Sequence, residues 1–374
     1  VVPAMLIVGG FLIFRVFLIR MGIVEGLPHH VNDLLSKPFV GGRNSIGTAV
    51  LYSIFSHLMW LFGIHGNNVL DGVAQTVFVP AGQVNAAMAA AGFAPPNMIT
   101  KTFFDVFVYM GGSGTTLALL ISLFIFGRKR GQQSLFKFAL PNSIFNINEP
   151  LIFGIPIVLN PYYALPFIFT PVLMFFTTAF AMKVGLVPYT GADVSWATPV
   201  FISGYIATGS FSGVLLQLVN LILAVSLYAP FVRLSDKMAD IRFRLAYHQL
   251  LKVVTSEYME GSMEIIDRVD EVGAAARRLS NQLDGAMSKG EMYLEYQPIM
   301  DVEGHEIHSI EALLRWDHPE YGSINPLVAV VLAEETGRIS RLGLWILEKA
   351  AAQRAQWTKD GLGDFHISVN ISTK

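Results

Sequence analysis

The stretch at residues 146–154, NINEPLIFG, places a carboxylate in apolar surroundings. Between residues 138 and 182, Glu149 is the only Asp, Glu, Lys or Arg. Asn146 and Asn148 supply amide donors and acceptors beside it. Short groups that both donate and accept suit a neutral polyol, whose hydroxyls also do both. The pattern therefore predicts a sugar site more readily than an ion site.

A second unusual stretch is WLFGIHGNN at residues 60–68. His65 lies between Gly63 and Gly66, where an apolar helix would end. The glycines permit close approach of the backbone, and Trp60 offers an aromatic face on which a sugar ring could lie. We therefore predict that His65 and Trp60 belong to the sugar site.

A third stretch, GGSGTT at residues 111–116, is rich in small residues. It lacks the strand and the Lys that a phosphate-binding loop requires, which argues against nucleotide binding there. Small residues in membrane helices mostly serve close helix packing.

Two polar residues of the C-terminal part, Glu311 and Asn370, fall near the C-terminal ends of their predicted strands. This is the face on which α/β barrels collect their active sites. Arg315 lies four residues beyond Glu311, and its planar fork could bind a phosphate with two hydrogen bonds. A salt-bridge or surface role is the alternative for each residue taken alone.

The elements that must position these residues differ between the two parts of the chain. Of the 26 Lys and Arg and 28 Asp and Glu residues, only 16 lie in residues 1–232. Long apolar segments there suit membrane crossing, which needs about 20 residues. We predict spans at 44–64, 103–126, 162–182 and 209–232, and residues 1–19 are a fifth candidate. We expect the sequence to be a fragment of a longer protein.

Lys and Arg residues alternate between the loops. Residues 20–43, 127–143 and the region after 232 are rich in them, which predicts that these segments are cytoplasmic. Four prolines within residues 139–161 should break any continuous helix, so we expect this segment to enter the bilayer and return. Irregular backbone at membrane depth requires a protein or water lining, so Glu149 should face a cavity.

Two alternative roles remain for a carboxylate within the membrane. Glu149 could pair with Lys101 or Lys137 to tie two segments together. It could also titrate as the proton relay of a proton-coupled secondary sugar transporter.

The composition of the C-terminal part indicates a separate soluble fold. Residues 233–282 form a predicted helical linker, because they contain no Pro and many charges. Alternating patterns predict strands at 292–300, 308–316 and 365–372, with two helices between the last two. Strand, strand, helices, strand is the opening of an incomplete α/β fold with partly parallel pairing. Cysteine is absent, and no basic patch suggests a nucleic acid polymer as partner.

Residues 1–235 resemble the lactose/cellobiose-type sugar permease subunit IIC of the bacterial phosphotransferase system. The resemblance rests on WLFGIHG, on the run from Lys101 to Asp105 that leads to GGSGTT, and on ALPNSIFNINEPLIFGIPIVLNP at 139–161. It implies a multi-pass homodimer in the inner membrane with re-entrant hairpins, in which Glu149 and His65 contact a disaccharide such as cellobiose. It also implies IIB and IIA partner subunits, surrounding lipid, and no cofactor for the permease.

Residues 283–374 resemble the EAL domain, a (β/α)8 barrel that hydrolyses cyclic di-GMP with Mg²⁺ or Mn²⁺. The motifs are YQPI, EALLRW, AEETG and SVNIS. The resemblance implies that Gln297 and Arg315 contact the nucleotide, while Glu311 and Asn370 are metal ligands. One carboxylate and one amide do not complete an octahedral shell, so we expect no hydrolysis by this chain. A membrane-anchored cyclic di-GMP phosphodiesterase or sensor is the alternative function.

Overall fold

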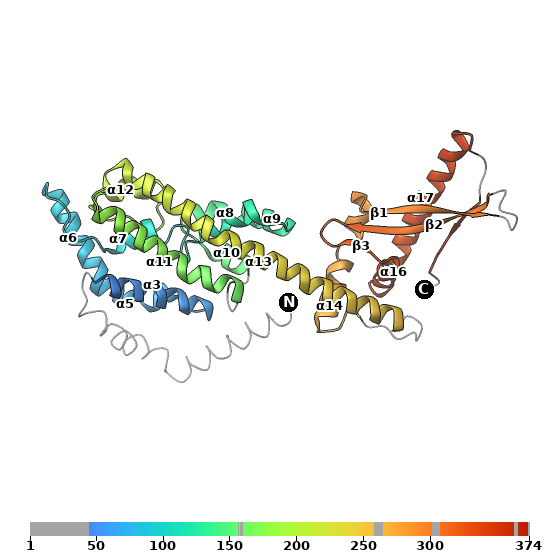
Figure 1. The fold of residues 1–374 in the computed structure, drawn as a ribbon, viewed down its shortest axis with the longest axis horizontal. Helices are drawn as coiled ribbons and strands as arrows, with labels where there is room; N and C mark the ends of the chain where they lie inside the picture. The colour runs from blue at the N-terminus through green and yellow to red at the C-terminus, as the bar shows by residue number, and fades with distance from the viewer. Residues whose placement is uncertain are drawn as a thin grey trace. The chain divides into compact units, whose positions relative to one another are not determined.

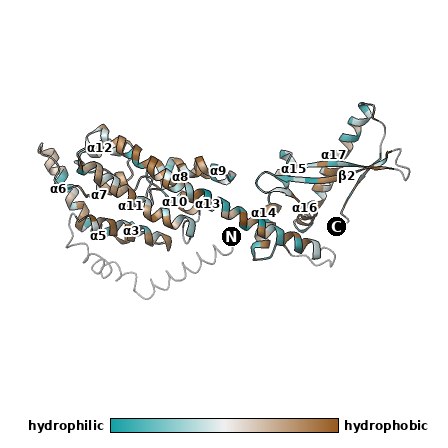
Figure 2. Ribbon diagram, viewed as in Figure 1, coloured by the Kyte–Doolittle hydropathy of each residue, from teal (hydrophilic) through white to brown (hydrophobic). Residues whose placement is uncertain are grey.

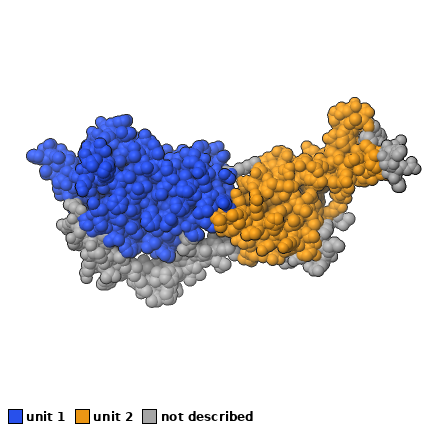
Figure 3. Space-filling view, in the orientation of Figure 1, with its two compact units in different colours: residues 1–237 blue, residues 238–374 orange. Residues whose placement is uncertain are grey.

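The computed structural model describes residues 45–155, 157, 160–257, 265–300, 307–362 and 366–372. The chain divides into two compact units, residues 1–237 and residues 238–374 (Figure 3). Hydrophobic residues predominate on the helices of the first unit, whereas hydrophilic and hydrophobic residues are mixed in the second (Figure 2). The unequal distribution of charge along the sequence therefore corresponds to two structural units.

The described part of unit 1 is helical (Figure 1). Its elements are α3 (Ile46–Leu61), α4 (Gly66–Val69), α5 (Asp71–Val73), η1 (Ala74–Phe78), α6 (Val79–Ala90), α7 (Lys101–Phe103), η2 (Phe104–Val108), α8 (Thr116–Phe126), α9 (Arg130–Ile144), α10 (Glu149–Gly154), α11 (Pro161–Lys183), α12 (Ile202–Thr208) and α13 (Phe211–Glu257).

Two described helices are long and apolar enough to cross a membrane, α11 and α13. They coincide with the segments predicted at 162–182 and 209–232. The segment predicted at 44–64 forms α3, a helix of 16 residues. The candidate at 1–19 lies outside the described residues.

The prediction of one continuous span at 103–126 is wrong. The segment contains η2 and α8, separated by a loop at residues 109–115. Gly111, Gly112 and Gly114 have positive φ angles of 82°, 95° and 80°. Such angles are favourable for glycine because it has no Cβ, and they do not occur within a right-handed helix. The glycine-rich stretch therefore interrupts the helix instead of packing inside it.

The helix is broken within the proline-rich segment as predicted, but not at Pro141. Pro141 lies inside α9, which continues to Ile144. A short connection at 145–148 follows, and α10 begins at Glu149 with Pro150 in its first turn. Proline suits the first turn of a helix because the N–H groups there have no helical partner.

Helix α13 is continuous over 47 residues and passes residue 232 without interruption. Its first part packs in the core of unit 1 through residues such as Ala224 and Tyr228. Its last turns contribute Phe243 and Leu250 to the core of unit 2. The predicted linker therefore begins as an extension of the apolar helix that starts at Phe211.

Unit 2 combines helices with a four-stranded sheet. Its further elements are α14 (Glu271–Ser280), α15 (Leu283–Lys289), β1 (Met292–Met300), β2 (Ile307–His318), β3 (Gly322–Ile324), α16 (Pro326–Glu335), α17 (Ile339–Lys359) and β4 (Ile367–Val369). Strand β2 pairs antiparallel with β1 and β3, and parallel with β4. The prediction of three strands with partly parallel pairing is confirmed, and β3 was not predicted.

Candidate functional site

A polar cavity of about 360 Å³ lies within unit 1. It is lined by His65, Asn67, Asn68, Asp71, Lys101, Asp105, Tyr109, Gly112, Ser113, Asn146, Asn148, Glu149 and Trp196. The lining segments come from distant parts of the sequence: the turn after α3, the broken helix at 101–115, the connection before α10 and the loop before α12. Four of the five predicted sugar-site residues are therefore gathered in one place.

Glu149 is exposed in the cavity at the start of α10. Within the described residues it forms no ion pair with Lys101 or Lys137. Lys101 is bound instead to Asp105. The structural alternative, in which Glu149 ties two segments through a lysine, does not describe this arrangement. The carboxylate is available to accept hydrogen bonds from a ligand.

His65 is held by the backbone that follows it. Its Nδ1 accepts a hydrogen bond of 3.3 Å from the N–H of Asn68, at the start of α4. A neutral imidazole that accepts at Nδ1 carries its proton on Nε2, which can then donate. The next residue, Gly66, lies so close to the backbone of Ser56 that a Cβ would collide with it. The glycine therefore lets the turn bring His65 to the cavity.

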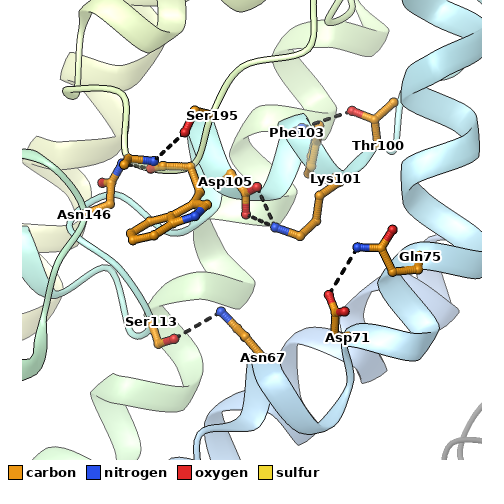
Figure 4. A network of polar contacts seen from close by, with 12 residues as sticks. Asn67, Asp71, Gln75, Thr100, Lys101, Phe103, Asp105, Ser113, Asn146 and Ser195 are labelled. Atoms are coloured by element: carbon orange, nitrogen blue, oxygen red, sulfur yellow. Dashed lines mark hydrogen bonds and ion pairs between the residues drawn. The ribbon is translucent and has the colours of Figure 1, made fainter.

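Asn148 joins the connection before α10 to the glycine loop. Its side chain is buried, and Nδ2 donates to the carbonyl of Ser113 over 3.2 Å. Gly112 lies directly beside it, since a Cβ there would be 2.8 Å from the Asn148 side chain. The hydroxyl of Ser113 accepts a hydrogen bond from Asn67 Nδ2 at 3.3 Å, which also links α4 to the glycine loop (Figure 4).

Trp60 does not line the cavity as predicted, and another tryptophan, Trp196, does. Trp60 is buried, is absent from the cavity lining, and packs against the ring of His65 with 4.5 Å between ring centroids. Trp196 lines the cavity and is 55% exposed. The aromatic wall is therefore supplied by Trp196, while Trp60 supports His65. Nothing in the local sequence around Trp196 resembles the other motifs, so sequence reasoning missed it.

Charged residues of the cavity wall were also missed. Lys101 Nζ lies 2.6 Å and 2.5 Å from the two carboxylate oxygens of Asp105, one helical turn away. Asp71 Oδ1 accepts from Gln75 Nε2 at 3.4 Å. Figure 4 shows both pairs facing the same space. The signal in the sequence was the presence of Asp71 and Asp105 within otherwise apolar segments.

In unit 2 the structure brings Glu311 and Asn370 together. Asn370 Nδ2 donates to Glu311 Oε1 over 2.8 Å, next to the parallel pairing of β2 with β4. Gln297 lies opposite Glu311 in the register of β1 and β2. Arg315 is further along β2, where its Nε donates to Glu295 Oε2 over 2.6 Å. Three of the four predicted residues are thus neighbours, and Arg315 is already paired with a carboxylate.

These residues do not by themselves make a complete site for Mg²⁺ or Mn²⁺. Glu311 and Asn370 present oxygen atoms, which such hard cations prefer. Among the described residues, however, no group of three or more His, Asp or Glu side chains could hold a metal ion. The pair supplies part of a coordination shell at most.

Comparison with known proteins accounts for both units. Residues 4–171 match the family model "Phosphotransferase system, EIIC", and residues 280–374 match "EAL domain". The Lichenan permease IIC component of Bacillus subtilis (strain 168) is 39% identical over 239 residues, covering 62% of this chain and 53% of the relative. The cellobiose-specific EIIC component of Geobacillus stearothermophilus is 38% identical over 224 residues, covering 59% and 50%.

A solved structure is similar to the helical part. The transporter ChbC, the IIC component from the N,N'-diacetylchitobiose-specific phosphotransferase system, has a TM-score of 0.52 and 42% identity. The match covers 56% of this chain and 49% of that chain. The chain spans about half the length of the relatives it matches. Its N-terminal part therefore contains a phosphotransferase system EIIC domain, and its C-terminal part contains an EAL domain.

Proposed function

We propose that unit 1 forms the sugar-binding portion of a phosphotransferase-type permease that carries a disaccharide across the bacterial inner membrane. The observation that supports this most strongly is the polar cavity lined by Glu149, His65, Asn148 and Trp196. Its volume of about 360 Å³ falls in the range of roughly 300–1,000 Å³ that is usual for small-ligand pockets. Carboxylate, imidazole and amide groups around one aromatic face suit a neutral sugar.

The names of the relatives narrow the class of sugar. Cellobiose and N,N'-diacetylchitobiose are both disaccharides with a β-glycosidic bond, and they are the sugars named for two of the relatives. We therefore propose a β-linked disaccharide as the ligand of the cavity. Glu149 would accept hydrogen bonds from sugar hydroxyls, and His65 would donate one through Nε2.

The same proposal assigns the arrangement in the membrane. The segment from α9 to residue 160 would enter the bilayer and return, so that Glu149 faces a water-filled cavity and not lipid. The permease would be a homodimer surrounded by lipid, with unit 2 in the cytoplasm. The phosphate would come from a IIB subunit that IIA recharges.

Binding of cellobiose to the purified full chain in detergent tests the ligand class. We expect saturable binding of cellobiose or N,N'-diacetylchitobiose, and none of a sugar 6-phosphate, because the carboxylates of the cavity repel an anion. Failure of every β-linked disaccharide to bind would refute the proposal.

Uptake separates this function from the rival proton-coupled transporter. Cells that express the chain with its IIB and IIA partners should lose sugar uptake when the general phosphotransferase proteins are deleted. Uptake that persists in the deletion strain and stops with an uncoupler would favour proton coupling through Glu149.

For unit 2 we propose a cyclic di-GMP-related role. We also propose that its strands and helices are the first elements of a TIM-type barrel. The neighbouring positions of Gln297, Glu311 and Asn370 support a shared nucleotide and metal face. Because Arg315 is paired with Glu295, a phosphate would have to replace that carboxylate. Titration of the chain with cyclic di-GMP, with and without Mn²⁺, tests whether unit 2 binds it.

A further inference from the structure

The side chain of Asn146 joins three segments that form the cavity. Its Oδ1 accepts from the N–H of Gly111 at 2.7 Å, in the glycine loop. Its Nδ2 donates to the carbonyl of Trp196 at 2.6 Å and to that of Thr198 at 3.2 Å. One amide therefore connects the helix break, the connection before α10 and the loop that carries Trp196.

These bonds use both donors of the amide. A neutral asparagine side chain has two N–H donors and one oxygen with two lone pairs. In Asn146 the nitrogen is bonded to two carbonyls and the oxygen to one N–H. No donor is left for a sugar hydroxyl, although Asn146 lies in the cavity lining. The side chain of Asn146 therefore acts as a cross-link between the segments around the cavity.

The backbone of Asn146 is suited to this cross-link. Its φ is 63°, in the left-handed region that asparagine tolerates better than most residues. Two residues earlier, the carbonyl of Ile144 accepts from the N–H of Val200 at 3.2 Å. A backbone hydrogen bond therefore also ties the loop that carries Trp196 to the end of α9.

We propose that Asn146 is a positioning residue for Trp196, and that it affects sugar binding only through the placement of that aromatic wall. The inference rests on the proposed function in one respect, that the cavity binds a sugar. An indole stacks on a sugar ring only when its plane lies parallel to the ring, so the orientation of its backbone matters. The amide of Asn146 bonds to the carbonyl of the tryptophan itself.

A double-mutant cycle on the affinity for cellobiose tests this. Asn146→Asp keeps the left-handed backbone and an oxygen acceptor but removes both donors. We expect it to weaken binding about tenfold, since the loss of hydrogen bonds of ordinary strength corresponds to roughly that factor. In a Trp196→Ala background the same change should have less than about a twofold effect, because the group it positions is gone. Equal effects in both backgrounds would show that Asn146 acts independently of Trp196, which would overturn the positioning role.

Two variants control for other causes. Asn146→Gly keeps the positive φ without any side chain, and it should weaken binding as Asn146→Asp does. Asn142→Asp makes the same change of charge four residues earlier, outside the cavity lining, and should leave the affinity unchanged.

A measurement without sugar separates this inference from the proposed function. The chain has five tryptophans, so fluorine NMR of 5-fluorotryptophan protein gives few signals, and Trp196→Phe assigns one of them. We expect Asn146→Asp to shift or broaden the Trp196 signal and to leave those of Trp316, Trp345 and Trp357 in place. An unchanged Trp196 signal would overturn the positioning role even if cellobiose binds. A changed signal without any sugar binding would overturn only the proposed function.

Discussion

The side chains of Glu311 and Asn370, which are 59 residues apart in sequence, are joined by a hydrogen bond of 2.8 Å beside the parallel pairing of β2 and β4. They are the two residues for which the EAL resemblance implies a role in metal binding. Their contact shows that the parallel pairing of β2 with β4 brings these two positions together.

From the small number of oxygen ligands that Glu311 and Asn370 could supply, we predict how the chain acts on cyclic di-GMP. Two ligands do not fix the position of Mg²⁺, which demands near-octahedral geometry. We expect no conversion of cyclic di-GMP to the linear dinucleotide in the presence of Mg²⁺ or Mn²⁺, measured by chromatography. Glu311→Gln serves as the blank, and product formation above that blank would contradict the expectation.

Substitution of Glu149 should weaken binding in the proposed sugar cavity more than substitution of any other lining residue. Glu149→Gln keeps the size of the side chain but removes its charge, and hydrogen bonds to charged groups are worth about 1.5–3 kcal/mol. We expect the affinity for cellobiose to fall by roughly 10- to 150-fold, measured by calorimetry. Glu348→Gln makes the same chemical change at an exposed position on α17 of unit 2, outside the cavity lining, and should bind normally. Wild-type affinity in the Glu149 variant would exclude this residue from the site.

The ion pair of Lys101 and Asp105 should contribute to the stability of unit 1. The Asp105 side chain is only 11% exposed, so removal of its partner leaves a poorly solvated charge. Because Lys101 is partly solvated, we expect Lys101→Met to cost about 1–3 kcal/mol. The double variant with Asp105→Asn should recover part of that loss in thermal unfolding. A double variant with the summed losses of the two single variants would contradict this coupling.

Helix α13 should hold the glycine loop through one buried hydroxyl. Tyr228 is fully buried, and its OH donates to the carbonyl of Gly114 over 2.6 Å. Tyr228→Phe leaves that buried carbonyl without its partner, so we expect a loss of about 1–3 kcal/mol in stability. Tyr205→Phe, at an exposed residue of α12, is the matched control, and both variants are compared by thermal unfolding in detergent. Equal melting temperatures for the two variants would argue against this contact.

The start of α14 should respond to acid. Asp270 caps the helix by accepting from the N–H of Gly273, and its pKa is lowered, first by hydrogen bonding from Arg268 and then by that cap. A carboxylate with a lowered pKa stabilises the fold above its unfolded value of about 4, and the contribution is lost as the pH falls through the folded value.

Hydrogen exchange measures this effect locally. Peptides covering residues 271–280 should exchange faster as the pH is lowered below about 4, after correction for the intrinsic rate. Asp270→Asn can still cap the helix but does not titrate, so its protection should stay constant. A parallel loss of protection in both proteins would assign the acid sensitivity to other groups.

The sequence alone was sufficient for the features that depend on short stretches. The strands at 292–300 and 308–316 follow from alternation, and α11 follows from an uninterrupted apolar run. One of the two helices predicted between the last two strands is α16, which has Pro326 in its first turn. Periodicity and composition act over a few residues, so no distant contact is needed to recognise them.

The sequence also determined that Glu149, His65 and their neighbouring asparagines have an unusual setting, because polar groups in long apolar segments are costly. Only the tertiary structure decided which residues share a cavity with them. Trp196 lines the cavity where Trp60 was predicted, and Asn146 joins the segments that form the cavity. Both roles depend on loops that are distant in sequence and meet only in the folded protein. The break at 109–115 was likewise decided by glycines whose positive φ angles depend on the surrounding packing.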